Sequence, residues 1–199
     1  MTTPDSGLMV GAAASLRRPD RFDPLTIAMH WTTLALLIVA YAAAWSVTQA
    51  TSEPSADAAL LIHRSTGALI WGLTVIRLVW KSTYAQAAVL PAETNPVQRV
   101  AARTVEWALY ALLAAQPITG FAQSVLRGRP FPLLGFTLPA MLARDKGLTR
   151  LFHNIHEITA WALLALIGMH ASAALFHHFV RRDGVLRSMA PGRSPQGRE

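Results

Sequence analysis

The chain has 199 residues, of which 52% are hydrophobic, and its 18 Lys and Arg residues outnumber 11 Asp and Glu residues to leave a net charge of +7. This length fits one domain, and the long apolar segments described below favour a membrane protein over a nucleic-acid-binding one. The absence of cysteine excludes disulfides, thiolate-ligated iron–sulfur clusters and covalent c-type haem.

Four long apolar segments follow one another along the chain. They are residues 25–48, 60–81, 104–126 and 151–180. Each has the roughly 20 residues that a helix needs to cross a hydrocarbon core of about 30 Å. They are rich in Ala and Leu and lack the period-two alternation of membrane strands. We therefore predict an all-α fold, an integral membrane four-helix bundle that occupies residues 21–190. A disordered N-terminal tail (1–20) and a C-terminal tail (191–199) are expected to flank it.

The distribution of positive charge predicts the orientation of the bundle. With a cytoplasmic N-terminus, twelve of the 18 Lys and Arg residues lie on the inner side and six on the outer side. Because inner loops carry the excess of Lys and Arg, both termini are predicted to be cytoplasmic. The alternative is that Arg17 and Arg18 belong to a twin-arginine export signal, but the first apolar run is long for one and three more spans follow it.

Four histidines are predicted to form two pairs between helices. His30 lies near the inner end of the first helix, and His63 lies near the outer end of the second. On the fourth helix, His156 and His170 are 14 residues apart, which keeps them within about 40° of one face and about 21 Å apart along the axis. Because successive helices alternate in direction, His63 is level with His156, and His30 is level with His170.

Two imidazoles that face each other are the axial ligands of a six-coordinate b-type haem, which can lie between helices. Zinc is the alternative metal, but it usually takes three or four protein ligands. Each level offers two histidines, with Glu157 beside His156 at the outer one. Gly67 and Gly168 lie near the histidines and leave room for a macrocycle, although small residues also permit close helix packing.

Other polar side chains near these levels are candidates for cofactor contacts. Arg64 at the outer level and Arg77 at the inner level are candidates to bind haem propionates, because guanidinium binds carboxylate in a bidentate fork. For Arg77, snorkelling to the inner interface is the alternative. His177 is a candidate to hydrogen-bond a quinone carbonyl or relay a proton at the inner surface, the alternative being a headgroup contact. His153 and His178 are predicted to be boundary residues.

The link between the third and fourth helices, residues 127–150, is strongly basic. It contains one acidic residue, Asp145, and five basic residues, namely Arg127, Arg129, Arg144, Lys146 and Arg150. We expect its apolar middle to cap the outer haem and its positive field to concentrate an anion from outside. A solvated loop is the alternative interpretation.

Five segments of this sequence match one known family: IAMHW, IHRSTGALIWGLTVIRLVWK, QPITG, RGRPFPLLGFTLP and IHEITAWALLALIGMHASAALFHHFVRRDGVLRSMAP. On these segments the chain resembles the bacterial cytochrome b561 family over nearly all of residues 21–191. The resemblance is to the short diheme type in particular, which includes superoxide oxidase.

The resemblance implies two b haems in a multi-pass protein of the bacterial inner membrane. The implied ligands are His30 with His170 for the inner haem and His63 with His156 for the outer haem, the same pairing that the topology predicts. The resemblance also implies electron exchange with the quinone pool, with superoxide as the periplasmic donor and ubiquinone as the acceptor. Two alternatives remain: a haem-bearing anchor subunit that takes electrons from a dehydrogenase or hydrogenase, and a haem-free metal carrier lined by histidines.

Overall fold

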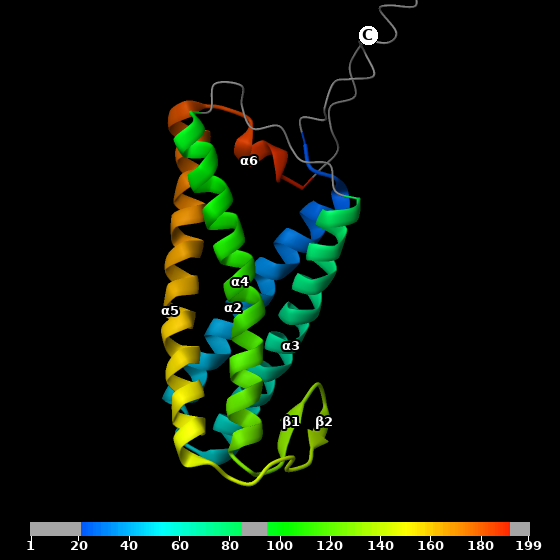
Figure 1. Ribbon diagram of the computed structural model, residues 1–199, viewed down its shortest axis with the longest axis vertical. Coiled ribbons are helices and arrows are strands. Elements are labelled where there is room, and N and C mark those ends of the chain that lie inside the picture. Colours follow the sequence, from blue (N-terminus) through cyan, green and yellow to red (C-terminus); the bar gives the residue numbers. More distant parts are fainter. Residues whose placement is uncertain (1–20, 85–94, 192–199) are drawn as a thin grey trace, which may run out of the picture.

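The computed structural model describes residues 21–84 and 95–191. This part of the chain forms a bundle of long helices with a strand pair at one end and a short helix at the other (Figure 1). The long helices are α2 (Pro24–Gln49), α3 (Glu53–Thr83), α4 (Pro96–Leu126) and α5 (Lys146–Phe176). A π-helical turn, η1 (His177–Arg181), continues α5 and is followed by α6 (Val185–Ser188). Strands β1 (Phe131–Leu133) and β2 (Phe136–Leu138) pair antiparallel. We call the two ends of the bundle the hairpin end and the α6 end.

Each long helix begins at a polar N-cap residue whose side chain accepts a hydrogen bond from a backbone N–H of the first turn. These residues are Asp23, Ser52, Asn95 and Asp145. Proline occupies one of the first two positions of α2, α3 and α4, where its missing N–H costs no helical bond. The caps explain why α3, α4 and α5 begin several residues before the predicted apolar segments, whose limits mark hydrophobic composition alone.

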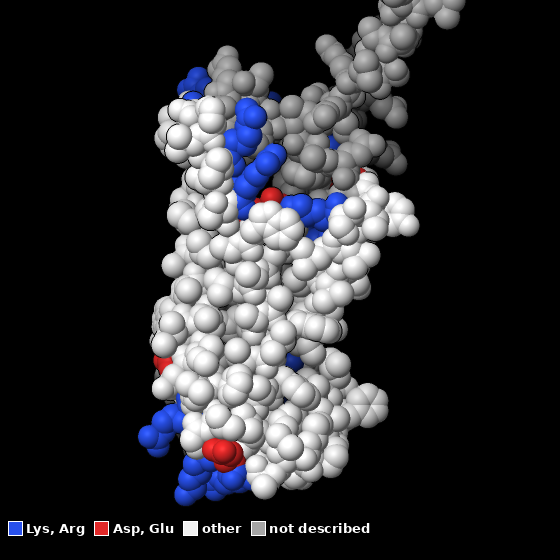
Figure 2. Space-filling model, viewed as in Figure 1, with Lys and Arg blue, Asp and Glu red and all other residues white. Residues whose placement is uncertain are grey.

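All four long helices contain a stretch that is long and apolar enough to cross a membrane, as predicted. On the face shown in Figure 2, Lys and Arg gather toward the two ends of the molecule, with a broad, almost uncharged band between them. This distribution suits a protein whose middle lies in hydrocarbon. The predicted N-terminal tail with Arg17 and Arg18, and the C-terminal tail beyond residue 191, lie outside the described residues.

One buried residue from each long helix meets its neighbours in the middle of the bundle. They are Ala40, Ile70, Leu113 and Leu163. Leu163 is 2% exposed, and it lies midway in sequence between His156 and His170. Because seven residues are about two helical turns, this apolar layer separates the level of His156 from the level of His170.

The helices do not all pack against one another equally. Close backbone packing joins α2 to α3, α4 to α5 and, less extensively, α3 to α4. Within the described residues, α5 packs closely on neither α2 nor α3, although the predicted histidine pairs extend between these helices. The histidine pairs therefore lie where the backbone of α5 is separated from those of α2 and α3, and the imidazole side chains extend into the space between these helices.

The strand pair of the hairpin end was not predicted from the sequence. Its turn places Leu134 and Gly135 at positive φ, 50° and 82°, and the Leu134 N–H donates to Ser65 Oγ of α3 at 2.9 Å. Phe131 is 4% exposed and meets the edge of Phe121. The strand pair is thus held on α3. The segment that links α4 to α5 ends at residue 145, because Lys146 already belongs to α5.

Candidate functional site

The structure brings the four predicted histidines together in the predicted pairs. Near the α6 end, the ring centroids of His30 and His170 are 6.2 Å apart, with the ring planes at 63°. Near the hairpin end, the centroids of His63 and His156 are 6.0 Å apart, with the planes at 85°. In both pairs one ring comes from α5, and the other comes from a helix that α5 does not pack against closely.

These separations fit one metal ion between two imidazoles. A metal–nitrogen bond of about 2 Å and roughly 1 Å from nitrogen to ring centre place the centroids of two trans ligands about 6 Å apart. Both measured separations agree with this value. The donor set, two neutral imidazoles at each level, is also the set that b-type haem takes.

Hydrogen bonds at the hairpin end fix which ring nitrogens are free to bind metal. His63 Nδ1 lies 2.8 Å from the Ala40 carbonyl oxygen. His156 Nδ1 lies 3.1 Å from the Gln116 carbonyl oxygen and 3.0 Å from Thr119 Oγ1. Because a carbonyl can only accept, each Nδ1 carries the hydrogen and each Nε2 keeps a lone pair for a metal.

One turn of α4 surrounds the His156 ring. A Cβ atom at Gly120 would lie 3.1 Å from His156 Cε1, so only glycine leaves the ring its present position. The Gln116 side-chain amide donates to the His156 carbonyl at 3.1 Å and to Thr159 Oγ1 at 2.8 Å. Sequence reasoning did not single out Thr119; the spacing of Gln116, Thr119 and Gly120 within one turn of QPITG is the signal that could have found it.

At the α6 end, the Arg77 side chain is partly buried, and one of its N–H groups is free to bind an anion. Its Nε is buried and has no hydrogen-bond partner among the described residues. Its guanidinium lies 5.4 Å from the centre of the Tyr110 ring, close enough to His30 and His170 to interact with them electrostatically. Because a buried N–H group is rarely left unpaired, the Arg77 side chain is suited to bind an anion, and its role as a propionate partner stays a prediction.

The two glycines beside the histidines border open space. A Cβ atom added at Gly67 or at Gly168 would meet nothing within 4 Å. Gly67 is one turn beyond His63, and Gly168 is two residues before His170. Gly67 shares a face of α3 with His63, so there is space beside the His63–His156 pair for a planar macrocycle. Gly168 lies about 200° around α5 from His170 and faces away from the His30–His170 pair. At that level the fit to a haem rests on the ring separation and on Arg77.

The hairpin end also carries a basic cluster of Arg64, Arg127 and Arg129. The Arg64 guanidinium lies 5.5 Å from the centre of the Phe131 ring, and its charge interacts with those of Arg127 and Arg129. Burial of Arg127, together with the neighbouring charge of Arg129, lowers the pKa of Arg127 below its ordinary value. Mutual repulsion among three cations creates a local field that an anion would relieve.

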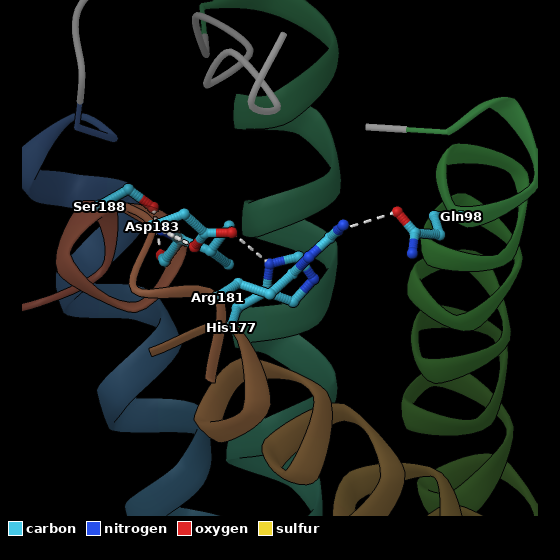
Figure 3. Close-up of polar contacts among 6 residues, drawn as sticks. Gln98, His177, Arg181, Asp183 and Ser188 are labelled. Atoms are coloured by element: carbon cyan, nitrogen blue, oxygen red, sulfur yellow. Dashed lines mark hydrogen bonds and ion pairs between the residues drawn. The ribbon is translucent and has the colours of Figure 1, made fainter. Parts of the chain in front are cut away.

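His177 forms a pair with Asp183 at the α6 end (Figure 3). Its Nδ1 lies 2.5 Å from Asp183 Oδ2, and Asp183 Oδ1 accepts from the Val185 N–H at 3.1 Å. Burial opposes ionisation of Asp183, but hydrogen bonds from His177 and Val185 outweigh it and lower its pKa. The chain reverses here through η1 and through Arg182 at a φ of 54°. Periodicity does not reveal such a turn, and Asp183 was therefore not predicted.

The remaining histidines do not join either pair. His153 lies on α5, three residues before His156, with its side chain 56% exposed and its Nε2 3.8 Å from Glu157 Oε2. His178 stacks edge-on with Phe179. Throughout residues 21–84 and 95–191, no group of three or more His, Asp or Glu residues comes together as a site for a metal ion, so the zinc alternative gains no third ligand there.

The sequence of the chain matches one protein family and several known relatives over most of its length. The family described as prokaryotic cytochrome b561 matches residues 21–192. "Cytochrome b561 homolog 2" of Escherichia coli (strain K12) is 34% identical over 174 residues, covering 86% of this chain and 92% of the relative. "Cytochrome b561 homolog 1" of the same organism is 31% identical over 182 residues, covering 87% and 99%. "Probable superoxide oxidase CybB" of Yersinia pestis is 29% identical over 173 residues, covering 86% and 96%.

Proposed function

Because the chain belongs to the prokaryotic cytochrome b561 family of electron-transfer membrane proteins, we propose that it is a diheme cytochrome that connects a periplasmic electron donor to quinone. The proposed donor is superoxide, the proposed acceptor is ubiquinone, and the location is the bacterial inner membrane. The observation that carries the proposal is the pair of neighbouring imidazoles at each of two levels, with ring centroids 6.0 and 6.2 Å apart.

The proposed haem ligands are His30 with His170 and His63 with His156. When bound, haem supplies reversible one-electron oxidation and reduction at its iron. The chain's own residues hold the rings in place through the Nδ1 contacts described for His63 and His156. An iron held by two imidazoles at each level would have no open position for oxygen, so these residues would suit a haem that transfers electrons. Arg77 and Arg64 are the proposed propionate partners at the two levels.

The hairpin end is the proposed entry side for electrons. Its basic cluster of Arg64, Arg127 and Arg129 would attract a small anion. Superoxide is such an anion, and the Yersinia pestis relative is named a probable superoxide oxidase. Two superoxide anions each lose one electron and leave as dioxygen. The two electrons, with two protons taken up at the other side, convert one ubiquinone to ubiquinol.

The α6 end is the proposed exit side, where His177 and Asp183 would serve the quinone. The Asp183 carboxylate accepts from His177 Nδ1, which directs Nε2 away from the carboxylate. When the imidazole is protonated, Nε2–H can donate to a quinone carbonyl and later transfer its proton, while Asp183 stabilises the positive charge. The excess of Lys and Arg on the loops at this end supports a cytoplasmic placement, with both termini inside.

The deciding experiment is a haem-reduction assay on the isolated, haem-loaded protein. Superoxide should reduce the haem rapidly, and added ubiquinone should reoxidise it with one ubiquinol formed for two superoxide anions. Purified protein without paired low-spin haem absorption would refute the diheme proposal. Intact haem that superoxide fails to reduce would favour the alternative, an anchor subunit that takes electrons from a protein partner such as a dehydrogenase or hydrogenase.

A further inference from the structure

Thr119 is placed to act on the electronic state of one axial ligand. Its Oγ1 lies 3.0 Å from His156 Nδ1. Its own hydrogen is directed elsewhere, since Oγ1 donates to the carbonyl oxygen of Ala115 at 3.1 Å or to that of Gln116 at 2.9 Å. The oxygen therefore presents a lone pair to His156, and the Nδ1–H is shared between this hydroxyl and the Gln116 carbonyl.

We propose that Thr119 is a positioning residue that holds His156 as a metal ligand and lowers the redox potential of the outer haem. The inference rests on the outer haem site proposed above and adds a residue to it. Acceptors on Nδ1–H increase electron donation from Nε2 to the metal. Greater donation stabilises ferric iron relative to ferrous iron, and the potential of that site falls.

The contacts around His156 make the effect local. Gly120 confines the ring from one side, because even a Cβ there would lie 3.1 Å from Cε1. The Gln116 amide holds the backbone carbonyl of the same residue at 3.1 Å. The ring therefore has little freedom to turn if the Thr119 oxygen is removed, and its Nδ1–H then has the Gln116 carbonyl alone as acceptor. In the described part of the chain, the ring nitrogens of His30 and His170 have no comparable hydrogen bond, so the inner site serves as an internal reference.

The matched variants are Thr119→Val and Thr119→Ser. Valine keeps the branched shape and replaces the hydroxyl by a methyl group, whereas serine keeps the hydroxyl. Loss of one neutral hydrogen bond shifts an equilibrium by about tenfold at most. Only the difference between the two oxidation states changes the potential, and the Gln116 carbonyl still accepts from Nδ1–H. For a one-electron couple, the upper limit of the shift is therefore about 60 mV.

The test is a spectroelectrochemical titration of the haem-loaded full-length protein. We expect Thr119→Val to raise one of the two midpoint potentials and leave the other unchanged, and Thr119→Ser to keep both near their original values. Equal shifts of both potentials, no shift, or a downward shift would overturn the inference.

If Thr119→Val binds haem poorly, the haem content of the two variants is measured in place of the potentials. Selective loss of one haem in Thr119→Val, with both retained in Thr119→Ser, would support the role of the hydroxyl in holding His156. Loss of both haems in the two variants alike would contradict it. A single haem in the unaltered protein would refute the diheme proposal itself, whereas two haems with unaltered potentials in Thr119→Val would refute the role of Thr119 alone.

Discussion

Replacement of His156 by alanine should remove one haem and leave the other. The facing rings of His63 and His156 are 6.0 Å apart, so neither imidazole alone can supply both axial bonds. The second pair is 14 residues away along α5, a rise of about 21 Å, and the apolar layer at Leu163 lies between the two levels. The haem content should therefore fall from two to one per chain, measured by pyridine haemochrome on purified protein.

Double variants test the pairing more strictly than single ones. If His63 and His156 hold the same haem, the variant that lacks both should retain one haem, as each single variant does. A variant that lacks His63 and His170 should retain none, because it breaks both pairs. The control is His153→Ala, on the same helix but largely exposed, which should keep both haems. One haem left in the His63 and His170 double variant, or both lost from His156→Ala, would refute the assignment.

Other changes have outcomes that follow from local geometry. Gly120→Ala places a Cβ 3.1 Å from His156 Cε1, so overpacking should cost about 1–3 kcal/mol and lower the melting temperature; an unchanged melting temperature would show that the ring moves freely. Replacing Arg127 and Arg129 by Gln should slow reduction by superoxide in stopped-flow measurements and flatten its dependence on ionic strength, since salt screens such fields; an unaltered salt dependence would place the anion elsewhere. The folded protein lowers the pKa of Asp183 from its ordinary value of 3.8, so the stability it adds is present above that value and is lost as pH falls through the lower folded value. Asp183→Asn should therefore lower the melting temperature near neutral pH and have little effect in strong acid; an equal effect at both would exclude ionisation as the cause.

The sequence was sufficient to predict the four-helix bundle and the relative placement of the four paired histidines. Hydropathy locates the four spans because lipid imposes a minimum length on each apolar segment. The 14-residue spacing of His156 and His170 then fixes their common face, since helical geometry leaves little freedom. The family resemblance was confirmed by the comparisons, whereas haem ligation by these residues stays a prediction.

The features that the sequence did not predict depend on contacts between segments or on irregular backbone. The Nδ1 contact of His156 requires the register of α4 against α5, which no spacing within either helix contains. Asp183 reaches His177 only because η1 and a left-handed Arg182 turn the chain back. The strand pair after α4 is three residues long on each side, too short for an alternating pattern to stand out.

The arrangement also explains why family membership determines the cofactor class more firmly than the donor. Both histidine pairs use α5, so the distance between the two levels is set by the rise of one helix and is independent of any loop. Of the groups proposed to meet a donor or an acceptor, Arg127 and Arg129 lie in the segment after α4, and Asp183 lies in the turn after η1. Arg64, the third member of the basic cluster, belongs to α3. We expect changes in those segments to alter the partner while the two imidazole pairs remain in place. The basic cluster and the turn at Asp183 are therefore the places where specificity should be tested.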